Sequence, residues 1–326
     1  MWRRCRAGQP RDRHTVCRPR PAREAWGLVV ATEARSEALD PIAPAVGTAR
    51  NPLLNLRLSL PGRIALAFLA FTAVAALTAP LIAPYEPNQV DYDVILQGPT
   101  FDHPLGTDEF GRDQLSRLLY GARISLLVPL AAVLLGTVGG GLLGLVTGYA
   151  GGRLDAIFQR LGDVIMSFPF LVAALVIVTV LGPSQTNVVI TLAVVQLPRA
   201  ARIVRSATLT VREELFVEAA RTIGANPARI IFIHVLPGTI APFIVAATIA
   251  LGAMVLAEAS MSFLGLGVPP PTSTWGNMLS GSSRLYVNDA PWLVISPGIA
   301  ITLLVLAFNT AGDALRDALD PRLRNR

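Results

Sequence analysis

Apolar runs close to 20 residues long recur along this chain and restrict what it can fold into. Only 15% of its 326 residues are charged, against roughly 25% in an average soluble domain. A helix needs about 20 apolar residues to cross a hydrocarbon layer of about 30 Å, whereas a soluble core protein shows shorter, amphipathic periods. The sequence therefore predicts an all-α polytopic membrane protein.

Six membrane spans are expected from the positions of these runs. They cover about residues 64–84, 124–149, 164–181, 188–205, 240–257 and 292–311. The fourth run is the least apolar, because arginines follow it closely, and we interpret its end as a cytoplasmic extension. Residues 56–326 are expected to form the transmembrane domain, and residues 1–55 a disordered, arginine-rich cytoplasmic tail.

Glycine recurs at every fourth position of the second span, at Gly136, Gly140, Gly144 and Gly148. This spacing places the four residues on one helix face, where missing side chains let a neighbouring helix approach closely. We interpret the stripe as a packing surface, and a glycine-lined conduit is the alternative. The polar segment 150–163 that follows is expected to be a cytoplasmic turn.

The arginines are distributed unequally between the two sides that six spans define. Outside residues 1–50, the side that holds both termini carries 14 arginines, and the other side carries only Arg112, Arg117, Arg123 and Arg284. Cytoplasmic loops of membrane proteins are enriched in positive charge. Both termini and the segment 206–237 are therefore predicted to be cytoplasmic, in a multi-pass protein of the cell membrane.

The loop between the first two spans, residues 86–120, is acidic and carries seven carboxylates. Asp108, Arg112 and Asp113 are expected to form a solvated group tied together by local ion pairs, and a contact with substrate is the alternative. Three leucines between residues 115 and 119 fall on one stripe, which predicts a helix that lies on the membrane or against the bundle.

The segment 206–237 is the one conspicuously polar insert between the later apolar runs. Thr210, followed three residues later by Glu213, fits a capping box and predicts a helix that begins at Val211. Gly224 is placed to end this helix in the left-handed conformation. The apolar stripe of the helix consists of Leu215, Phe216, Ala219, Ala220 and Ile223. The opposite, polar face consists of Glu214, Glu218 and Arg221.

A second short helix is expected to begin at Pro227, with Asn226 as its cap. Pro237 is expected to stop that helix before the fifth span. A pair of helices this small cannot bury its own apolar face, so it needs a groove on a partner. Packing against its own bundle or on lipid headgroups is the alternative.

Residue content excludes or disfavours several classes of function. All 28 basic residues are arginine, and a Walker-type phosphate loop requires a lysine, so the chain is not by itself a P-loop ATPase. The few histidines and cysteines are too far apart in sequence for metal-ligand spacing, so no metal site is expected. No catalytic motif of a membrane-embedded enzyme is visible, and no catalytic residue is predicted.

An ion-coupled transporter or channel would require ionisable residues inside its spans. Glu258, near the outer end of the fifth span, comes closest to this requirement. We predict Glu258 and Ser262 as candidates for a gate or a substrate contact, with a capped helix end in a polar pocket as the alternative.

Several motifs resemble bacterial ABC importer permeases. Glu218-Ala219-Ala220, Gly224 and Leu236-Pro237 are similar to the EAA loop of that family, although His234 and Gly238 replace its usual isoleucine and asparagine. The stretches "HPLGTDEFGRD", "GARISL", "GYAGGRLD", "EASMSFLGLGVPPP", "WGNML" and "FNTAGDALRDALDPRL" resemble the C-type subunit of the dipeptide, oligopeptide and nickel branch. The resemblance covers about residues 60–323.

This resemblance implies a type I ABC importer permease fold with six transmembrane helices. It implies half of a translocation path for di- or oligopeptides delivered by an extracytoplasmic binding protein, while import of nickel or another small solute fits the same frame. The implied partners are a homologous B-type permease subunit in a heterodimer, two ATP-binding subunits that hold ATP and Mg, and the lipid bilayer. Neither a cofactor on this chain nor a nucleic-acid partner is implied.

The resemblance also implies roles within the segment 206–237, which would be the loop that couples the permease to the ATP-binding subunits. In that role Leu215, Phe216 and Ala219 would fill a groove of the ATPase. Glu218 and Arg221 would make polar contacts with it.

Overall fold

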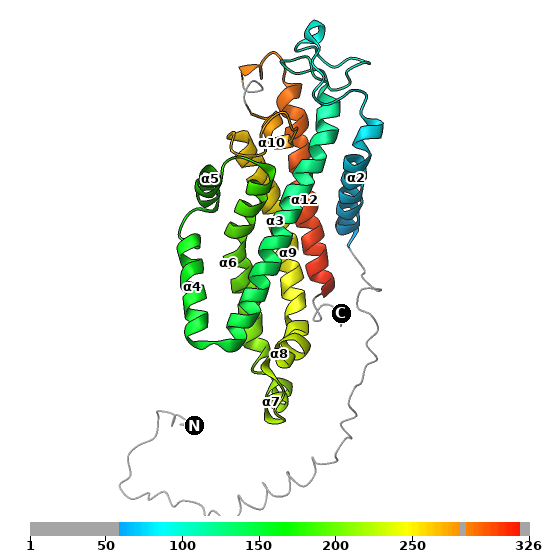
Figure 1. The fold of residues 1–326 in the computed structure, drawn as a ribbon. Coiled ribbons are helices and arrows are strands. Elements are labelled where there is room, and N and C mark those ends of the chain that lie inside the picture. The colour runs from blue at the N-terminus through cyan, green and yellow to red at the C-terminus, as the bar shows by residue number, and fades with distance from the viewer. Residues whose placement is uncertain (1–58, 281–284, 320–326) are drawn as a thin grey trace, which may run out of the picture. The chain divides into compact units, whose positions relative to one another are not determined.

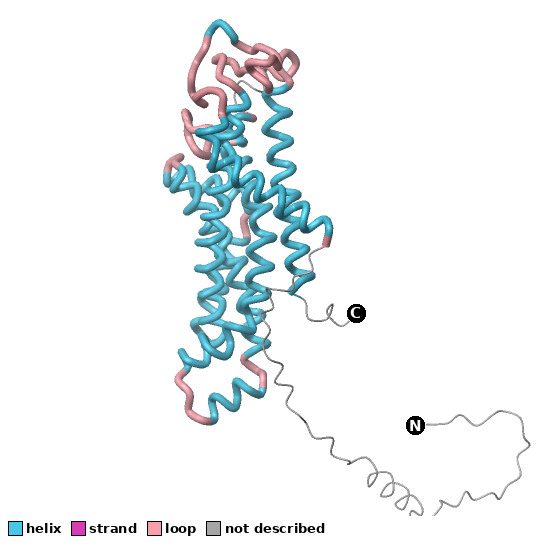
Figure 2. The backbone as a smooth tube through the Cα atoms, turned by 90° about the vertical axis from the view of Figure 1, so that its right-hand side faces the viewer, coloured by secondary structure: helices cyan, strands magenta, loops and turns pink. Residues whose placement is uncertain are grey.

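The computed structural model describes residues 59–280 and 285–319, and the expected tail over residues 1–55 lies outside them. Within the described part of the chain the regular elements are helices, with one isolated β-bridge between Thr107 and Asp113. The helices run side by side, and most of the loops gather at the two ends of the bundle (Figures 1 and 2). The all-α prediction is confirmed.

Among the described residues, five stretches of helix are long and apolar enough to cross a membrane. The helices that form them are α2 (Leu60–Ile82), α3 (Gln114–Ala150), α6 (Gln185–Val211), α9 (Leu236–Phe263) and α12 (Trp292–Leu319). Each coincides with a predicted span, but α3, α6, α9 and α12 extend well beyond the apolar runs, because polar flanking turns remain helical. The multi-pass membrane architecture is thereby established.

The third span differs from the prediction of one helix over residues 164–181. The segment 150–163, expected to be a turn, lies mostly within helix α4 (Gly152–Met166), and the apolar run continues only as α5 (Phe170–Leu181). The two helices meet at an angle of 92°. Pro169 forms the N-cap of α5, where a residue without an N–H group interrupts the helix. Because 12 residues of helix rise only about 18 Å, α5 cannot cross a bilayer alone.

The glycine face of α3 lies against α6 along much of its length. A methyl group at Gly140 would overlap the carbonyl oxygen of Leu197, and one at Gly144 would overlap that of Ala201. At Gly136 the added carbon would lie 2.7 Å from the Ala193 carbonyl oxygen, and at Gly148 it would lie 3.1 Å from the Thr208 side chain. All four glycines therefore face α6, with no space for a conduit between the two backbones.

The outer helices are joined to this pair by two apolar clusters. One cluster unites α5 with α3, α6 and α9 around Val128, Val178, Leu192 and Met254. The other unites α2, α3, α9 and α12 with the short helix α10 (Trp275–Met278), whose Trp275 is buried. The Trp275 indole nitrogen donates to the Leu118 carbonyl oxygen at 2.9 Å, which fixes the 264–280 segment on α3.

Candidate functional site

Helix α7 (Leu215–Thr222) lies at the end of the bundle opposite the 83–113 loop (Figure 1). The predicted capping box at Thr210 is wrong, because α6 continues to Val211 and the Thr210 hydroxyl donates to the Ser206 carbonyl oxygen at 3.3 Å. The chain turns over residues 212–214, and α7 begins one turn later than expected, with Glu214 at its N-cap. Helix α6 thus extends past Thr210 despite the local capping signal there.

One face of α7 is apolar and largely uncovered. The exposed fractions of Leu215, Phe216 and Ile223 are 81%, 51% and 84%, and Ala219 is exposed beside them. Four members of the predicted stripe therefore face outward. Burial of a large apolar side chain stabilises a protein or complex by about 1.5–3 kcal/mol. Exposure of this apolar face to water is therefore unfavourable unless a partner covers it.

The opposite side of α7 is anchored to the bundle. Val217 is fully buried and Ala220 is 5% exposed, in an apolar cluster with Leu145 of α3 and Val204 of α6. Ala220 therefore does not belong to the outward face, and Val217 is a contact that the sequence reasoning missed. The sequence does contain a signal for this contact, because Val217 and Ala220 are three residues apart and hence neighbours on one side of the helix.

Arginines tie α7 and the preceding turn to the end of α3. The Arg221 guanidinium lies over the Tyr149 ring, 5.1 Å from the ring centre, and Arg212 donates to the Gly148 carbonyl oxygen at 2.9 Å. Glu218 is exposed. Arg221, predicted to reach a partner, thus already contacts this chain's own aromatic ring.

The turn after α7 follows the predicted chemistry at two positions. Gly224 has φ of +78°, and a Cβ at this residue would meet no atom within 4 Å, so the glycine is required by backbone conformation. The Asn226 side chain accepts a hydrogen bond from the Ala228 N–H at 2.9 Å and caps α8 (Pro227–Arg229).

The expected stop at Pro237 is wrong. Helix α8 continues through the π-helical stretch η3 (Ile230–Val235) into α9, which contains Leu236 and Pro237 in its first turn. A proline there needs no N–H partner inside the helix, so it does not end it. The half-buried Leu236 packs on the apolar cluster beneath α7, and the second short helix is therefore the start of the fifth span.

Glu258 and Ser262 lie one turn apart near the other end of α9. Glu258 is fully buried and Ser262 is 2% exposed, and the Ser262 hydroxyl donates to Glu258 Oε1 at 2.8 Å. The other carboxyl oxygen has no hydrogen-bond partner among the described residues. The pair is enclosed by α9 and the docked 264–280 segment, since a methyl group at Gly276 would lie 2.8 Å from the Ser262 Cβ.

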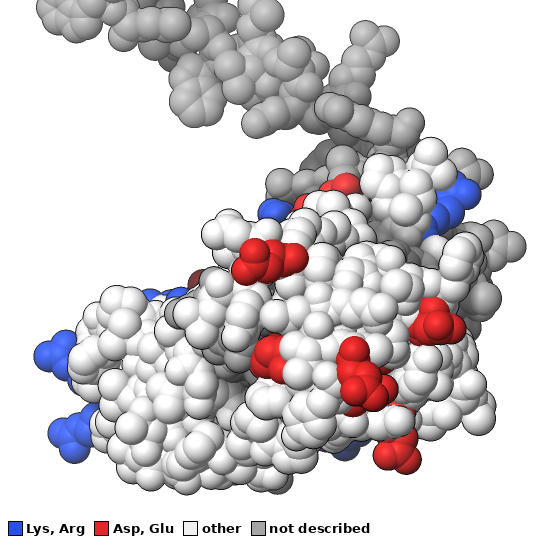
Figure 3. Space-filling view, turned by 90° about the horizontal axis from the view of Figure 1, so that it is seen from above, with Lys and Arg blue, Asp and Glu red and all other residues white. Residues whose placement is uncertain are grey.

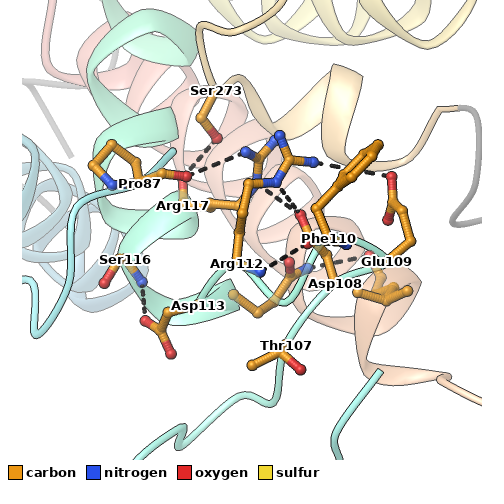
Figure 4. A network of polar contacts seen from close by, with 12 residues as sticks. Pro87, Thr107, Asp108, Glu109, Phe110, Arg112, Asp113, Ser116, Arg117 and Ser273 are labelled. Atoms are coloured by element: carbon orange, nitrogen blue, oxygen red, sulfur yellow. Dashed lines mark hydrogen bonds and ion pairs between the residues drawn. The ribbon is translucent and has the colours of Figure 1, made fainter. Parts of the chain in front are cut away.

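The 83–113 loop is a folded cap that contains the predicted acidic cluster (Figure 4). The Arg112 Nε donates to Asp108 Oδ2 at 2.6 Å, and the Arg117 Nε lies 3.6 Å from the same oxygen. Asp113 caps α3 through the Ser116 N–H at 2.7 Å and also contacts His103 at 3.0 Å. The expected ion pairs exist, but the expected solvation is wrong, because Asp108 and Asp113 are only 4% and 2% exposed.

The three leucines that follow Asp113 do not form a separate surface helix. They belong to the first turns of α3, which runs without a break into the second span. Viewed from this end, the surface shows acidic side chains on several loops (Figure 3). The exposed carboxylates of this end are those of Glu86, Asp91, Asp93, Asp102 and Asp289.

An apolar cavity of about 330 Å³ lies between α3, α6 and α9, one layer inward from α7. Leu145 and Leu236 line it and also pack beneath α7, while Phe243 closes its α9 side. The cavity has no charged residue in its wall. Across residues 59–280 and 285–319, no group of three His, Cys, Asp or Glu side chains is placed to hold a metal ion.

Comparison with known proteins finds similarity to membrane components of transport systems. Residues 140–325 match the family model described as the binding-protein-dependent transport system inner membrane component. A dipeptide transport system permease protein of Alkalihalophilus pseudofirmus is 44% identical over 77% of this chain and 82% of its own length. A di/tripeptide transport system permease protein of Pseudomonas aeruginosa is 44% identical over 80% of this chain and 88% of its own.

A glutathione transport system permease protein of Escherichia coli is also 44% identical, over 79% of this chain and 85% of its own length. Among solved structures, a chain of the MetNI methionine ABC transporter in an inward-facing conformation superposes with a TM-score of 0.52 at 21% identity. That match covers 63% of this chain and 98% of the other. The structural likeness supports the fold.

Proposed function

Because the chain belongs to the family of binding-protein-dependent transport system inner membrane components, we propose that it forms half of the path of an ATP-driven peptide importer. The observation that carries this proposal is the uncovered apolar face of α7. Leu215, Phe216 and Ile223 are exposed on a helix that Val217 holds firmly to the bundle. Such a face suits a groove of a partner subunit.

The partner at α7 is an ATP-binding subunit, and a second one serves a homologous B-type permease subunit. This chain contains no lysine, so ATP and Mg are bound by the partners rather than by a P-loop here. Phe216 and Leu215 enter the ATPase groove, and Glu218 lies at the rim. Closure of the two ATPases displaces α7, and the displacement passes to the spans.

The cargo is a peptide delivered by an extracytoplasmic binding protein. The names of the relatives support this assignment, since they specify dipeptide, di/tripeptide and glutathione transport. The end with the 83–113 cap faces the binding protein, and α7 and both termini lie in the cytoplasm. The excess of arginine on the α7 side supports this orientation.

Co-purification of the ATP-binding subunits with the tagged permease tests the role of α7. Phe216→Glu places a charge at the centre of the apolar face and is expected to reduce the bound ATPase about thirtyfold, which corresponds to about 2 kcal/mol for a buried aromatic anchor. Tyr92→Glu is the matched control, because Tyr92 is an aromatic side chain 75% exposed at the opposite end. Undiminished ATPase binding by Phe216→Glu would overturn the proposal.

Uptake in proteoliposomes tests the cargo separately. Vesicles that contain the permease pair and both ATPases are expected to accumulate a radiolabelled dipeptide only when the binding protein and ATP are supplied. Accumulation of nickel but not of any di- or oligopeptide under the same conditions would contradict the peptide assignment and leave the α7 assignment standing.

A further inference from the structure

The arginines near the end of α6 contact the preceding bent helix pair at three levels. They recur at three-residue intervals, so successive members lie on neighbouring turns. We call this set the arginine ladder, and it consists of Arg199, Arg202 and Arg205. Arg199 lies over the ring of Phe170. Arg202 contacts the carboxylate of Asp163, and Arg205 contacts the carboxylate of Asp155. Positive charge at a membrane surface accounts for none of these specific contacts.

The Asp155–Arg205 contact is the most constrained of the three. Arg205 Nε donates to Asp155 Oδ1 and its terminal nitrogen donates to Oδ2, both at 2.6 Å. This two-pronged geometry fixes orientation as well as distance. The two side chains are only 27% and 14% exposed. Asp155 also lies in the first turn of α4, where a negative charge is stabilised by the helix dipole.

The Asp163–Arg202 contact is similar in charge but much less constrained. A single bond of 2.5 Å joins the terminal nitrogen of Arg202 to one carboxylate oxygen, and the side chains are 47% and 54% exposed. Solvent-exposed ion pairs of this kind contribute little to the stability of a fold. The chain thus offers an internal control on the same two helices.

The connection between α6 and α7 is short and hydrogen-bonded to α6. Only residues 212–214 separate the two helices, and their N–H groups all donate back to α6, to the carbonyl oxygens of Thr208, Thr210 and Val211. A displacement of α7 is therefore passed to the end of α6, which carries Arg205.

Helix α4 is held to α6 but turns away sharply where α5 begins. Close to the Asp163–Arg202 pair the two helices approach each other, since a methyl group at Gly162 would lie 3.2 Å from the Pro198 ring. Beyond Met166 the chain bends by 92° into α5, which is buried in the bundle core through Ala174 and Val178. A rotation of α4 relative to the core would therefore take place at this bend.

We propose that the Asp155–Arg205 ion pair is a positioning contact that makes α4 follow α6 when α7 moves, so that the α4–α5 bend changes with each ATPase cycle. The proposal rests on the assignment of α7 as the coupling helix. Asp155 and Arg205 touch neither ATP nor cargo in this scheme. Their role is to transmit motion to the bent helix pair α4 and α5, which meet at 92°.

The first test compares transport with ATP hydrolysis in proteoliposomes that contain the whole transporter. Asp155→Asn keeps the shape of the side chain but removes its charge. It is expected to lower dipeptide uptake per ATP hydrolysed by at least about fivefold, the low end of ordinary coupling factors, with ATPase co-purification unchanged. Asp163→Asn is the matched control and is expected to leave the ratio unchanged.

The charge exchange Asp155→Arg with Arg205→Asp tests whether the ion pair itself, rather than either side chain alone, is required for coupled uptake. It is expected to recover at least half of the wild-type ratio, because the pair is restored with its partners reversed. An unchanged ratio in Asp155→Asn, or an exchange variant that assembles yet stays as defective as the single variant, would overturn the proposal. If Asp155→Asn is not inserted, the exchange variant decides alone, by its ratio.

A second measurement is independent of the cargo. Spin labels at Ala156→Cys on α4 and Asp313→Cys on α12, with Cys5 and Cys17 replaced by serine, report the separation of α4 from the bundle. The separation is expected to change between the nucleotide-free and vanadate-trapped complexes, and Asp155→Asn is expected to abolish that change. An equal change in both backgrounds would overturn the role of the pair, whereas loss of ATPase binding in Phe216→Glu bears only on α7.

Discussion

The Arg221 guanidinium lies over the face of the Tyr149 ring, 5.1 Å from its centre, and so joins α7 to the last turn of α3. A cation over an exposed aromatic face contributes about 0.5–1 kcal/mol. Together with the Arg212 bond to the Gly148 carbonyl oxygen, it holds α7 and the turn before it against the end of α3. This pairing gives the first prediction.

Tyr149→Leu is expected to loosen α7 without unfolding the bundle. Loss of about 0.5–1 kcal/mol corresponds to roughly a two- to fivefold rise in the open population, so trypsin should cleave after Arg221 faster by that factor. Limited proteolysis of the purified permease measures the rate. Tyr149→Phe retains the aromatic face and should be cleaved at the wild-type rate; equal rates in the leucine variant would refute the contact.

Gly224 is expected to tolerate substitution according to backbone conformation rather than size. Its φ of +78° disfavours side chains, although the space around it is empty. Gly224→Asn should retain most ATPase binding, because asparagine enters the left-handed region more readily than other residues. Gly224→Val should lose more, since a β-branched residue is a true outlier there. Co-purification ranks the two, and a valine variant as good as asparagine contradicts the argument.

Gly144→Ala is expected to destabilise the bundle, whereas Gly139→Ala is not. At Gly144 the added methyl would overlap the Ala201 backbone carbonyl, while at Gly139 it would meet only the Leu197 side chain at 3.7 Å. Overpacking of this kind costs about 1–3 kcal/mol. Thermal unfolding followed by size-exclusion chromatography should show a lower midpoint for Gly144→Ala alone. Equal midpoints would mean that α6 moves aside freely.

Asp108→Ala is expected to unfold the 83–113 cap. The carboxylate accepts from the Arg112 Nε and from the N–H groups of Phe110 and Arg112, so its removal leaves buried groups unpaired at a cost of about 3–5 kcal/mol.

Glu109→Ala is the control for Asp108→Ala. Glu109 lies 3.9 Å from Arg112 and is 19% exposed, and its removal should cost less than about 1 kcal/mol. Hydrogen exchange of the cap distinguishes the two variants, and similar exchange rates in both would show that the Asp108 network does not hold the cap.

Much of the membrane architecture could be predicted from local sequence. The apolar runs located five of the six expected spans to within a few turns, because the thickness of the hydrocarbon layer imposes a length that a single membrane-crossing helix must meet. The third is a bent pair of helices instead. The glycine spacing identified the face of α3 that meets α6, and the conformation of Gly224 followed from its place after an amphipathic segment.

Local signals failed where two of them competed or where a distant partner decided. Thr210 fits a capping box, yet α6 continues past it, because packing of a long helix outweighs a cap worth about 1 kcal/mol. Pro237 resembles a stop, yet it lies in the first turn of α9. The buried state of Asp108 was not predicted, since it depends on how the whole 83–113 loop folds over the start of α3, where Arg117 contacts the carboxylate.

The sequence by itself determined that this chain crosses a membrane several times, that it lacks the lysine of a phosphate loop, and that one polar insert carries an apolar stripe. These properties depend on composition and on neighbours within a few residues. Only the tertiary structure decided which side of α7 is anchored by Val217, where the third span bends, and that Arg205 is paired with Asp155 across 50 positions of sequence. Such contacts depend on how helices far apart in the chain pack together, and helical periodicity holds no information about that.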